Sequence, residues 1–402
     1  MTDRKEKPAT ITCGRAALLF HITLLVVITA LIFGPMFYRR LRQPGSDFGM
    51  HLTFTQQAIQ EGRWPPHLLY HLAVAVLSGF TECRSHLGIC SMVILGVALL
   101  ARLLLSAHIL GGTTSQGLTR LADKVRTSEN TLVTALTFSL LLCSPIANFW
   151  QKTHYMGQIS PNVWESPTWI FAQPFQLLAF AVLLREPSGR LASSVGAGGI
   201  LLLAALAKPN YLLAVLPAWL AVSAARGMFR NGRMLGSAAW LAGVAAATLA
   251  MQYHVAFGSA SPPLASYQIV VAPFRVWRYW SACIPASLVV SLAFPAVYVA
   301  VFRKYVRDRP ALTLAWLATG FALFWMAAFA EQSRLTGELS PAFNFSWGAH
   351  FAASVLFLYT LRDLLAQNDG RWRALVAWGA YAAHLLSGVG WLGKQLCGLD
   401  YH

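Results

Sequence analysis

The residues best suited to chemistry lie in short polar segments between apolar runs. Asp47 directly follows Ser46, and His51 lies four residues beyond Asp47. If a helix begins at Ser46, Asp47 occupies its first turn, where a carboxylate is favoured, and His51 shares its face. Asp47 is then either a general base near a membrane surface or a carboxylate that merely starts a helix. Spacing alone favours the second interpretation.

A second polar segment runs from Tyr155 to Thr168 and contains two prolines and a glycine. A continuous helix is therefore not expected there. The segment offers an amide in Asn162, an indole in Trp164 and a carboxylate in Glu165. Aromatic faces and fixed amides are suited to stacking against and hydrogen-bonding a sugar ring. The alternative is an interfacial tryptophan surrounded by turn residues.

Lys208, Pro209, Asn210 and Tyr211 interrupt a long apolar stretch. A charge at membrane depth is costly unless it faces a cavity or a partner, and proline breaks the helical hydrogen-bond ladder there. A lysine at such a break can hold a lipid-linked phosphate as a point charge, with Asn210 beside it. The alternative is a turn between two short helices, with the Lys208 side chain extending to the interface.

Two further segments contribute candidate substrate-binding residues. Arg275 and Arg278 stand in the basic and aromatic sequence FRVWRYW. Guanidinium groups suit phosphate, although an aromatic belt with head-group contacts explains this cluster slightly better. The polar segment from Glu331 to His350 adds His350 as a binding candidate.

His67 and His71 are spaced i, i+4, a spacing that can hold a metal ion. No carboxylate or cysteine partner is obvious from the sequence, so no metal site and no cofactor are predicted. The sequence also contains no Walker A loop, Rossmann fingerprint, HExxH or G-x-S-x-G motif. ATP hydrolysis and dinucleotide chemistry therefore lack support.

The composition indicates what must position these residues. Of the 402 residues, 56% are hydrophobic and only 11% are charged, whereas about a quarter are charged in soluble domains. These values exclude a disordered chain, a coiled coil, a disulfide scaffold and an ordinary cytosolic enzyme, and they indicate an integral membrane protein. The net charge of +16 fits lysine and arginine kept in cytoplasmic loops, because no basic stretch carries a nucleic-acid reader motif. Membrane lipids are thus expected partners, and nucleic acid is not.

The apolar runs predict an all-α, polytopic transmembrane helical bundle. It forms one domain over residues 1–402, with about eleven spans, two of them short, and a partial or juxtamembrane helix. The runs are approximately 16–37, 68–80 (the partial helix), 88–109, 131–149, 168–184, 194–206, 211–225, 234–253, 285–302, 312–330, 347–365 and 375–392.

The distribution of lysine and arginine predicts an orientation. With a cytoplasmic N-terminus and a non-crossing 68–80 helix, the inner segments hold about 19 of these residues and the outer segments about 10, as the positive-inside rule expects. Four polar segments then share the non-cytoplasmic face: Tyr38–His67, Trp150–Pro167, His254–Ile284 and Glu331–Ser346.

Three segments resemble parts of the GT-C superfamily of membrane glycosyltransferases. They are the first loop, which contains Asp47 and continues as EGRWPPHLLYH, the loop SPNVWESPT, and the broken helix KPNY. The resemblance covers about residues 16–225 and leaves 226–402 as additional transmembrane helices. It implies a bacterial inner membrane, a polyprenyl-phosphate-linked sugar donor, a glycan or lipid acceptor, and catalysis by extracytoplasmic loops.

The same resemblance implies that Asp47 deprotonates the acceptor hydroxyl. Members commonly carry paired acidic residues, whereas Asp47 has no acidic neighbour. This departure puts a bound metal in doubt and weakens the base assignment, and Glu165 is the candidate for the second carboxylate.

Other functions remain open. A transporter or flippase explains broken helices and buried charge equally well, and it predicts symmetry between two halves, of which the sequence gives no convincing sign. An O-antigen-type polymerase or ligase predicts a large arginine-rich outer loop, whereas the outer segments here reach only about 30 residues. A scaffold subunit would leave Asp47, Glu165 and Lys208 freely replaceable.

Overall fold

A computed structural model describes residues 15–43, 45–117, 126–146, 155–185, 191–257, 267–306, 309–367 and 370–397. Arg4, Lys5 and Lys7, which contribute to the predicted orientation, lie outside these ranges, as do residues 150–154 of the polar segment Trp150–Pro167. The longer helices are α1 (Arg15–Arg42), α2 (Asp47–Glu61), α3 (Leu68–Leu77), α4 (Arg84–Gly117), α6 (Arg126–Leu142), α7 (Pro167–Leu184), α8 (Leu191–Ala207), α9 (Leu212–Ala225), α10 (Gly232–Phe257), α12 (Ile284–Val301), α14 (Pro310–Ala328), α15 (Ser346–Leu365) and α16 (Arg371–Cys397).

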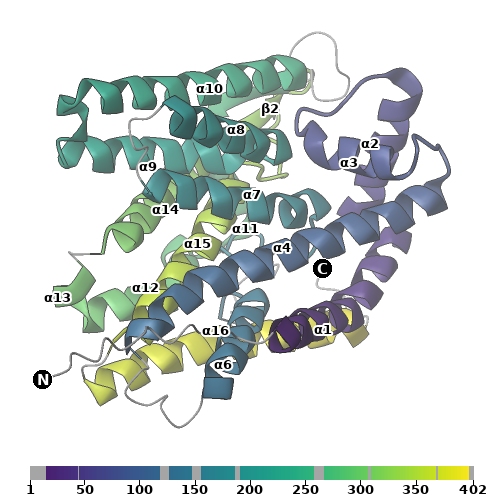
Figure 1. The fold of residues 1–402 in the computed structure, drawn as a ribbon. Helices are drawn as coiled ribbons and strands as arrows, with labels where there is room; N and C mark the ends of the chain where they lie inside the picture. The colour runs from purple at the N-terminus through teal and green to yellow at the C-terminus, as the bar shows by residue number, and fades with distance from the viewer. Residues whose placement is uncertain are drawn as a thin grey trace, which may run out of the picture.

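The fold is a helical membrane bundle, as the apolar runs predict (Figure 1). Seven helices within the described ranges are long and apolar enough to cross a bilayer: α1, α4, α7, α10, α12, α14 and α16. The helices α3, α6, α8 and α9 are apolar but shorter. Every predicted apolar run therefore corresponds to a helix, and the chain is an integral membrane protein.

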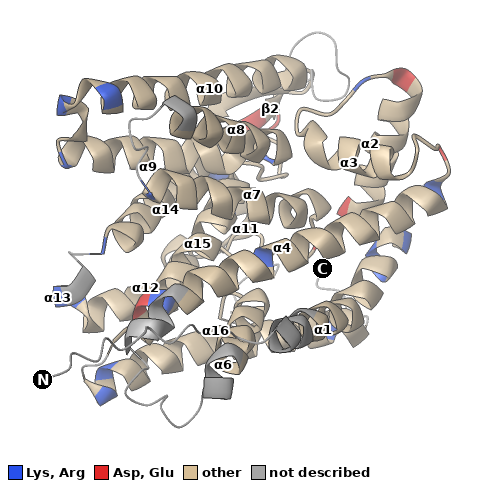
Figure 2. Ribbon diagram, in the orientation of Figure 1, with Lys and Arg blue, Asp and Glu red and all other residues tan. Residues whose placement is uncertain are grey.

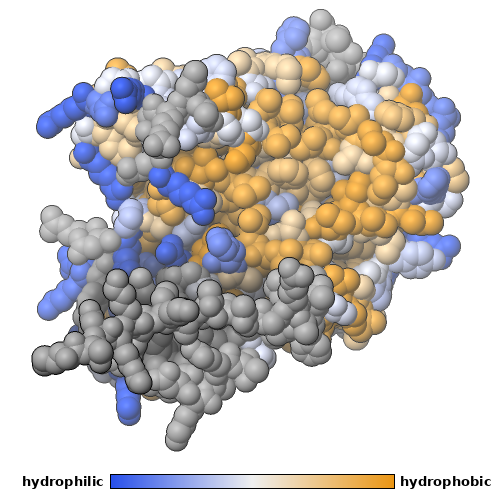
Figure 3. All heavy atoms as spheres, in the orientation of Figure 1, coloured by the Kyte–Doolittle hydropathy of each residue, from blue (hydrophilic) through white to orange (hydrophobic). Residues whose placement is uncertain are grey.

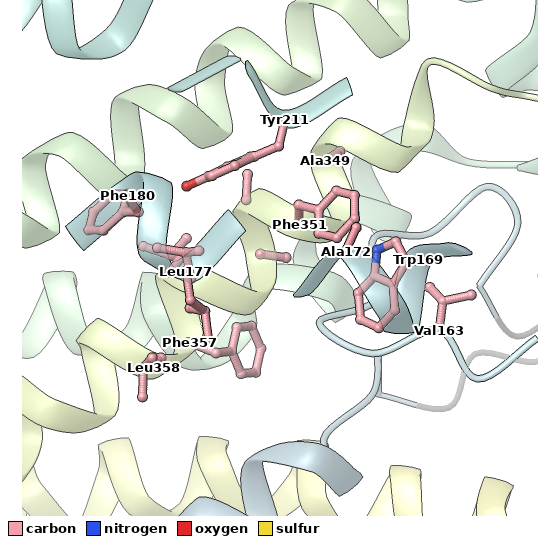
Figure 4. Packing of buried hydrophobic residues seen from close by; sticks show 14 of the residues in the cluster. Val163, Trp169, Ala172, Leu177, Phe180, Tyr211, Ala349, Phe351, Phe357 and Leu358 are labelled. Carbon is pink, nitrogen blue, oxygen red and sulfur yellow. The ribbon is translucent and has the colours of Figure 1, made fainter. Parts of the chain in front are cut away.

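The helix α15 lies in the interior of the bundle and is buried along nearly its whole length. It packs against α14, α4, α12, α7 and α9, so helices from residues 16–225 and from residues 226–402 share one core. In this core the rings of Trp169 and Phe351 stack with centroids 5.4 Å apart, and Figure 4 shows them beside Tyr211. Because α15 faces protein, it carries polar residues such as His350 and Ser354 without exposing them to lipid.

The all-α bundle carries one small two-stranded sheet in its polar segments. Strands β1 (Tyr267–Val271) and β2 (Phe329–Ser333) pair antiparallel, with Tyr267 opposite Ser333. The short helix α11 (Arg275–Trp280) follows β1. Five-residue strands without clear alternation between apolar and polar residues leave little periodic signal in a sequence.

The molecular surface has an apolar band between two polar ends (Figure 3). At one end lie the C-terminal turn of α1, together with α2, α3, β1, β2 and α11; we call this the loop end. The opposite end contains α13 (Arg303–Val306) and the turn between α9 and α10 (Figures 1 and 2). Most candidate residues are grouped at the loop end.

Candidate functional site

The helix α2 positions Asp47 and His51. Ser46 caps its N-terminus by accepting a hydrogen bond from the Gly49 backbone N–H at 3.0 Å. Gly62 ends it in the left-handed conformation, with φ of 68°, which glycine adopts without a steric penalty. His51 Nε2 lies 3.5 Å from Asp47 Oδ1, so the predicted helix start and the shared face are confirmed.

Residues 155–166 form a buried loop that is fixed by hydrogen bonds to the surrounding helices. The Ile159 N–H donates to Ser291 Oγ at 2.8 Å, and the Trp277 indole N–H donates to the Gly157 carbonyl at 2.8 Å. Buried loops are uncommon because their backbone polar groups need such partners. The loop therefore holds the start of α7 in a defined place.

Asn162 and Trp164 of this loop face protein. The Asn162 amide donates to the carbonyls of Leu140 and Cys143 at 2.7 and 2.6 Å, and its oxygen accepts from Arg102 at 2.7 Å. Trp164 is 2% exposed and contacts Phe33, with ring centroids 4.4 Å apart. In this arrangement both residues fix the loop against α1, α4 and α6, and the polar atoms of Asn162 are already used.

Lys208 lies buried between α8 and the 3-10 turn Pro209–Tyr211. Its Nζ donates to Thr168 Oγ1 at 3.0 Å and lies 4.0 Å from the centroid of the Trp347 ring. The Gln176 amide donates to the Lys208 carbonyl at 2.8 Å, which satisfies backbone freed by the helix break. The lysine thus points into the protein. The alternative interpretation, in which its side chain extends to the membrane interface, does not describe this arrangement.

A chain of polar groups joins Lys208 to Asp47. Thr168 Oγ1 lies 3.3 Å from Ser166 Oγ, and the Ser166 hydroxyl lies close enough to the Asp47 carboxylate to act on its pKa. Burial raises the pKa of Asp47, while the charge of Lys208 and the Ser166 hydroxyl act in the opposite direction. The carboxylate side chain is still 28% exposed, so it can be reached from outside the bundle.

Glu165 brings a second carboxylate to the same cluster. Its Oε1 lies 3.9 Å from Arg40 Nη2, and its Oε2 is buried without a hydrogen-bond partner among the described residues. Burial raises the pKa of Glu165 to about 7, against the opposing effect of Arg40. The charge of Asp47 also contributes to this increase, which indicates that the two carboxylates are close enough to influence each other.

His350 lies near Lys208, because both side chains lie beside the Trp347 ring. Its Nδ1 lies 2.9 Å from the Ser160 backbone nitrogen and 3.2 Å from the Ser160 carbonyl oxygen, so both contacts with Ser160 use this nitrogen and neither uses Nε2. That Nε2 is buried without a partner among the described residues. The ring lies beside Trp347, with centroids 5.7 Å apart.

Asn210 has a structural contact, and two predicted arginines stand apart. The Asn210 amide donates to the Asn344 carbonyl at 3.0 Å and so ties the helix break to the start of α15. Arg275 and Arg278 are exposed on α11, and within the described ranges no hydrogen bond or ion pair joins them to Lys208 or Asp47. They are therefore surface cations of the loop end.

No family model, curated protein or solved structure matches the chain. The geometry is thus the basis for any functional conclusion. It brings together Asp47, His51, Glu165, Lys208 and His350, which the sequence singles out separately.

Sequence reasoning missed several members of the cluster. Ser166, Thr168 and Trp347 contact predicted residues but carry no spacing signal of their own. The sequence analysis also found no third ligand for His67 and His71. In the structure His51 supplies one, because a ring nitrogen from each histidine lies within 4.8 Å of the others. A search for histidines on neighbouring amphipathic segments would have found this group.

Proposed function

We propose that this protein is a membrane glycosyltransferase. It moves a sugar from a polyprenyl-phosphate donor to the hydroxyl group of a glycan or lipid acceptor. The observation that carries the proposal is the buried Lys208, held at a helix break and connected through Thr168 and Ser166 to the Asp47 carboxylate. A phosphate needs a cation, an acceptor hydroxyl needs a base, and this cluster offers both side by side.

The proposed reaction uses each group once. Lys208 binds the donor phosphate as a point charge, and Asp47 accepts the proton of the acceptor hydroxyl. The acceptor oxygen forms a bond to the anomeric carbon as the bond from that carbon to the phosphate oxygen breaks. Polyprenyl phosphate leaves as an anion, so no strong general acid is required. Glu165 and His350 line the same cluster and contact the sugar or the acceptor.

The membrane supplies the donor in this proposal. A polyprenyl chain remains in lipid while its phosphate lies at the interface, so its binding site must have a cation at the end of the apolar band. We propose that the phosphate enters the protein from the interface to reach Lys208, whose Nζ points inward, and that the exposed Arg275 and Arg278 offer head-group contacts at the loop end. We propose that the loop end is extracytoplasmic in a bacterial inner membrane and that the N-terminus is cytoplasmic.

The test is an assay of the purified full chain in nanodiscs with a panel of polyprenyl-phosphate sugars and hydroxyl acceptors. Wild type should release polyprenyl phosphate, and Asp47→Asn should lose about 10²- to 10⁴-fold in rate, the usual contribution of a general base. Glu61→Gln is the matched control, because Glu61 is an exposed carboxylate on the same helix. Equal rates for Asp47→Asn and wild type would remove the base assignment. Tight donor binding without release would favour a transporter or flippase.

A further inference from the structure

We propose that His51, His67 and His71 form a binding site for a divalent transition metal ion, Zn²⁺ being the best fit. His51 lies on α2, His71 on α3, and His67 directly precedes α3. One nitrogen from each ring lies within 4.8 Å of the others. The inference concerns metal binding alone and does not depend on sugar transfer.

The distance between two of the nitrogens already fits a tetrahedral ion. His51 Nδ1 and His71 Nε2 are 3.3 Å apart. Two imidazole nitrogens at about 2.0–2.1 Å from Zn²⁺ in tetrahedral geometry are separated by about 3.3–3.4 Å. One ring nitrogen of His67 lies within 4.8 Å of a ring nitrogen of each of the other two histidines, so a shift of about 1–2 Å completes the geometry.

Hydrogen bonds around the cluster leave lone pairs directed inward. The Thr55 hydroxyl donates its single proton to the His51 carbonyl at 2.9 Å, so its oxygen accepts from His71 Nδ1 at 2.8 Å. His71 Nε2 then carries a lone pair. His51 Nε2 faces Asp47 Oδ1 at 3.5 Å, which places its proton there and leaves a lone pair on Nδ1.

Two lone pairs that face each other at 3.3 Å repel, whereas a cation between them is attracted to both. His67 adds to this argument, because its Nε2 is buried without a hydrogen-bond partner in the described part of the chain.

The outer contacts follow the pattern of metal-binding histidines, in which the second ring nitrogen donates to a carboxylate or another oxygen. Asp47 has this role toward His51, and Thr55 has it toward His71. Three neutral imidazoles suit Zn²⁺ and its first-row neighbours rather than Mg²⁺ or Ca²⁺, which prefer oxygen ligands. Three protein ligands leave the fourth tetrahedral position for water or an anion.

The test uses the full chain in nanodiscs, purified with an affinity tag that contains no histidine. After treatment with a chelator, Zn²⁺ is added back and the bound metal is counted by mass spectrometry. Wild type should bind one Zn²⁺ per chain, and Co²⁺ should give the visible absorption of a four-coordinate nitrogen site that Zn²⁺ removes. His51→Ala and His67→Ala should abolish this binding. His254→Ala, which removes an exposed histidine of α10, should not.

Two further variants keep the result interpretable if alanine at buried positions prevents folding. Thr55→Val and His67→Gln preserve side-chain size, and size-exclusion chromatography reports whether they fold. Thr55→Val should weaken Zn²⁺ binding about 10- to 100-fold through loss of the contact to His71. Absence of stoichiometric Zn²⁺ in wild type, or equal binding by all folded variants, would overturn the proposal. A thiolate charge-transfer band would do the same, since it would place the ion at an exposed cysteine such as Cys83.

Discussion

Replacing Lys208 with methionine should weaken ligand binding while leaving the thermal stability of the protein almost unchanged. The substitution keeps the length of the side chain and removes its charge. Nζ then no longer donates to Thr168 Oγ1 at 3.0 Å or lies over Trp347 at 4.0 Å. Each contact is worth about 2 kcal/mol when buried. This loss is offset because the substitution removes the cost of burying a charge, which is several kcal/mol for a residue that is only 7% exposed. The melting temperature should therefore change little.

Binding of a phosphate-linked lipid should fall sharply in the same variant. A hydrogen bond to a charged group contributes about 1.5–3 kcal/mol, which corresponds to about a 10- to 200-fold increase in Kd. Donor affinity is measured in nanodiscs with a fluorescent polyprenyl phosphate, and kcat and KM are determined separately. Lys304→Met is the control, since Lys304 is exposed on α13 at the opposite end.

Wild-type affinity in a folded Lys208→Met protein would refute the assignment of Lys208 to the phosphate. A large fall in melting temperature would instead show that folding requires the lysine charge. In that case Lys208 would be a structural link between α7, the helix break and α15, and the proposed binding site would lose its cation.

Three further outcomes are expected. Asp47→Asn should lower kcat while donor affinity changes little, as kinetics and direct binding can establish. Because burial raises the pKa of Glu165 from 4.5 to about 7, the folded chain retains a proton that the unfolded chain releases. The free energy of unfolding should therefore decline by about 3 kcal/mol at most between about pH 4.5 and 7, and Glu165→Gln should flatten this decline in thermal unfolding curves. Gly388→Ala should lower the melting temperature, since its Cβ would lie 1.5 Å from the Leu142 carbonyl oxygen, whereas Gly390→Ala, with open space around it, should not.

The helices could be predicted from the sequence because a lipid bilayer restricts the segments that cross it. A segment that crosses a bilayer must be apolar and must satisfy its own backbone, so each apolar run became a helix. The start of α2 was also predictable, since Ser46 followed by Asp47 is a local capping signal. The strands β1 and β2 were not predictable in this way, because their pairing joins residues 58 to 66 positions apart.

Candidate residues were predictable by type but not by contact. Asn162 was expected to face a sugar, yet its amide binds the Leu140 and Cys143 carbonyls and Arg102. An amide in a loop has the same sequence signature whether its partners are protein or ligand. Lys208 behaved differently, because a buried charge in an apolar stretch is costly wherever its partners lie, and this cost is visible in the sequence.

The candidate groups share one physical feature, which is that each lies near the N-terminal end of a helix. Asp47 begins α2, Glu165 stands two residues before α7, Lys208 precedes the turn that leads into α9, and His350 lies near the start of α15. Helix N-termini carry partial positive charge and unpaired N–H groups. Contacts of Ser166 with Asp47 and of Asn210 with Asn344 bring these helix starts together around one buried lysine. We infer that the ligand group next to Lys208 itself is an anion, because its ammonium group and the helix starts around it carry the same sign of charge.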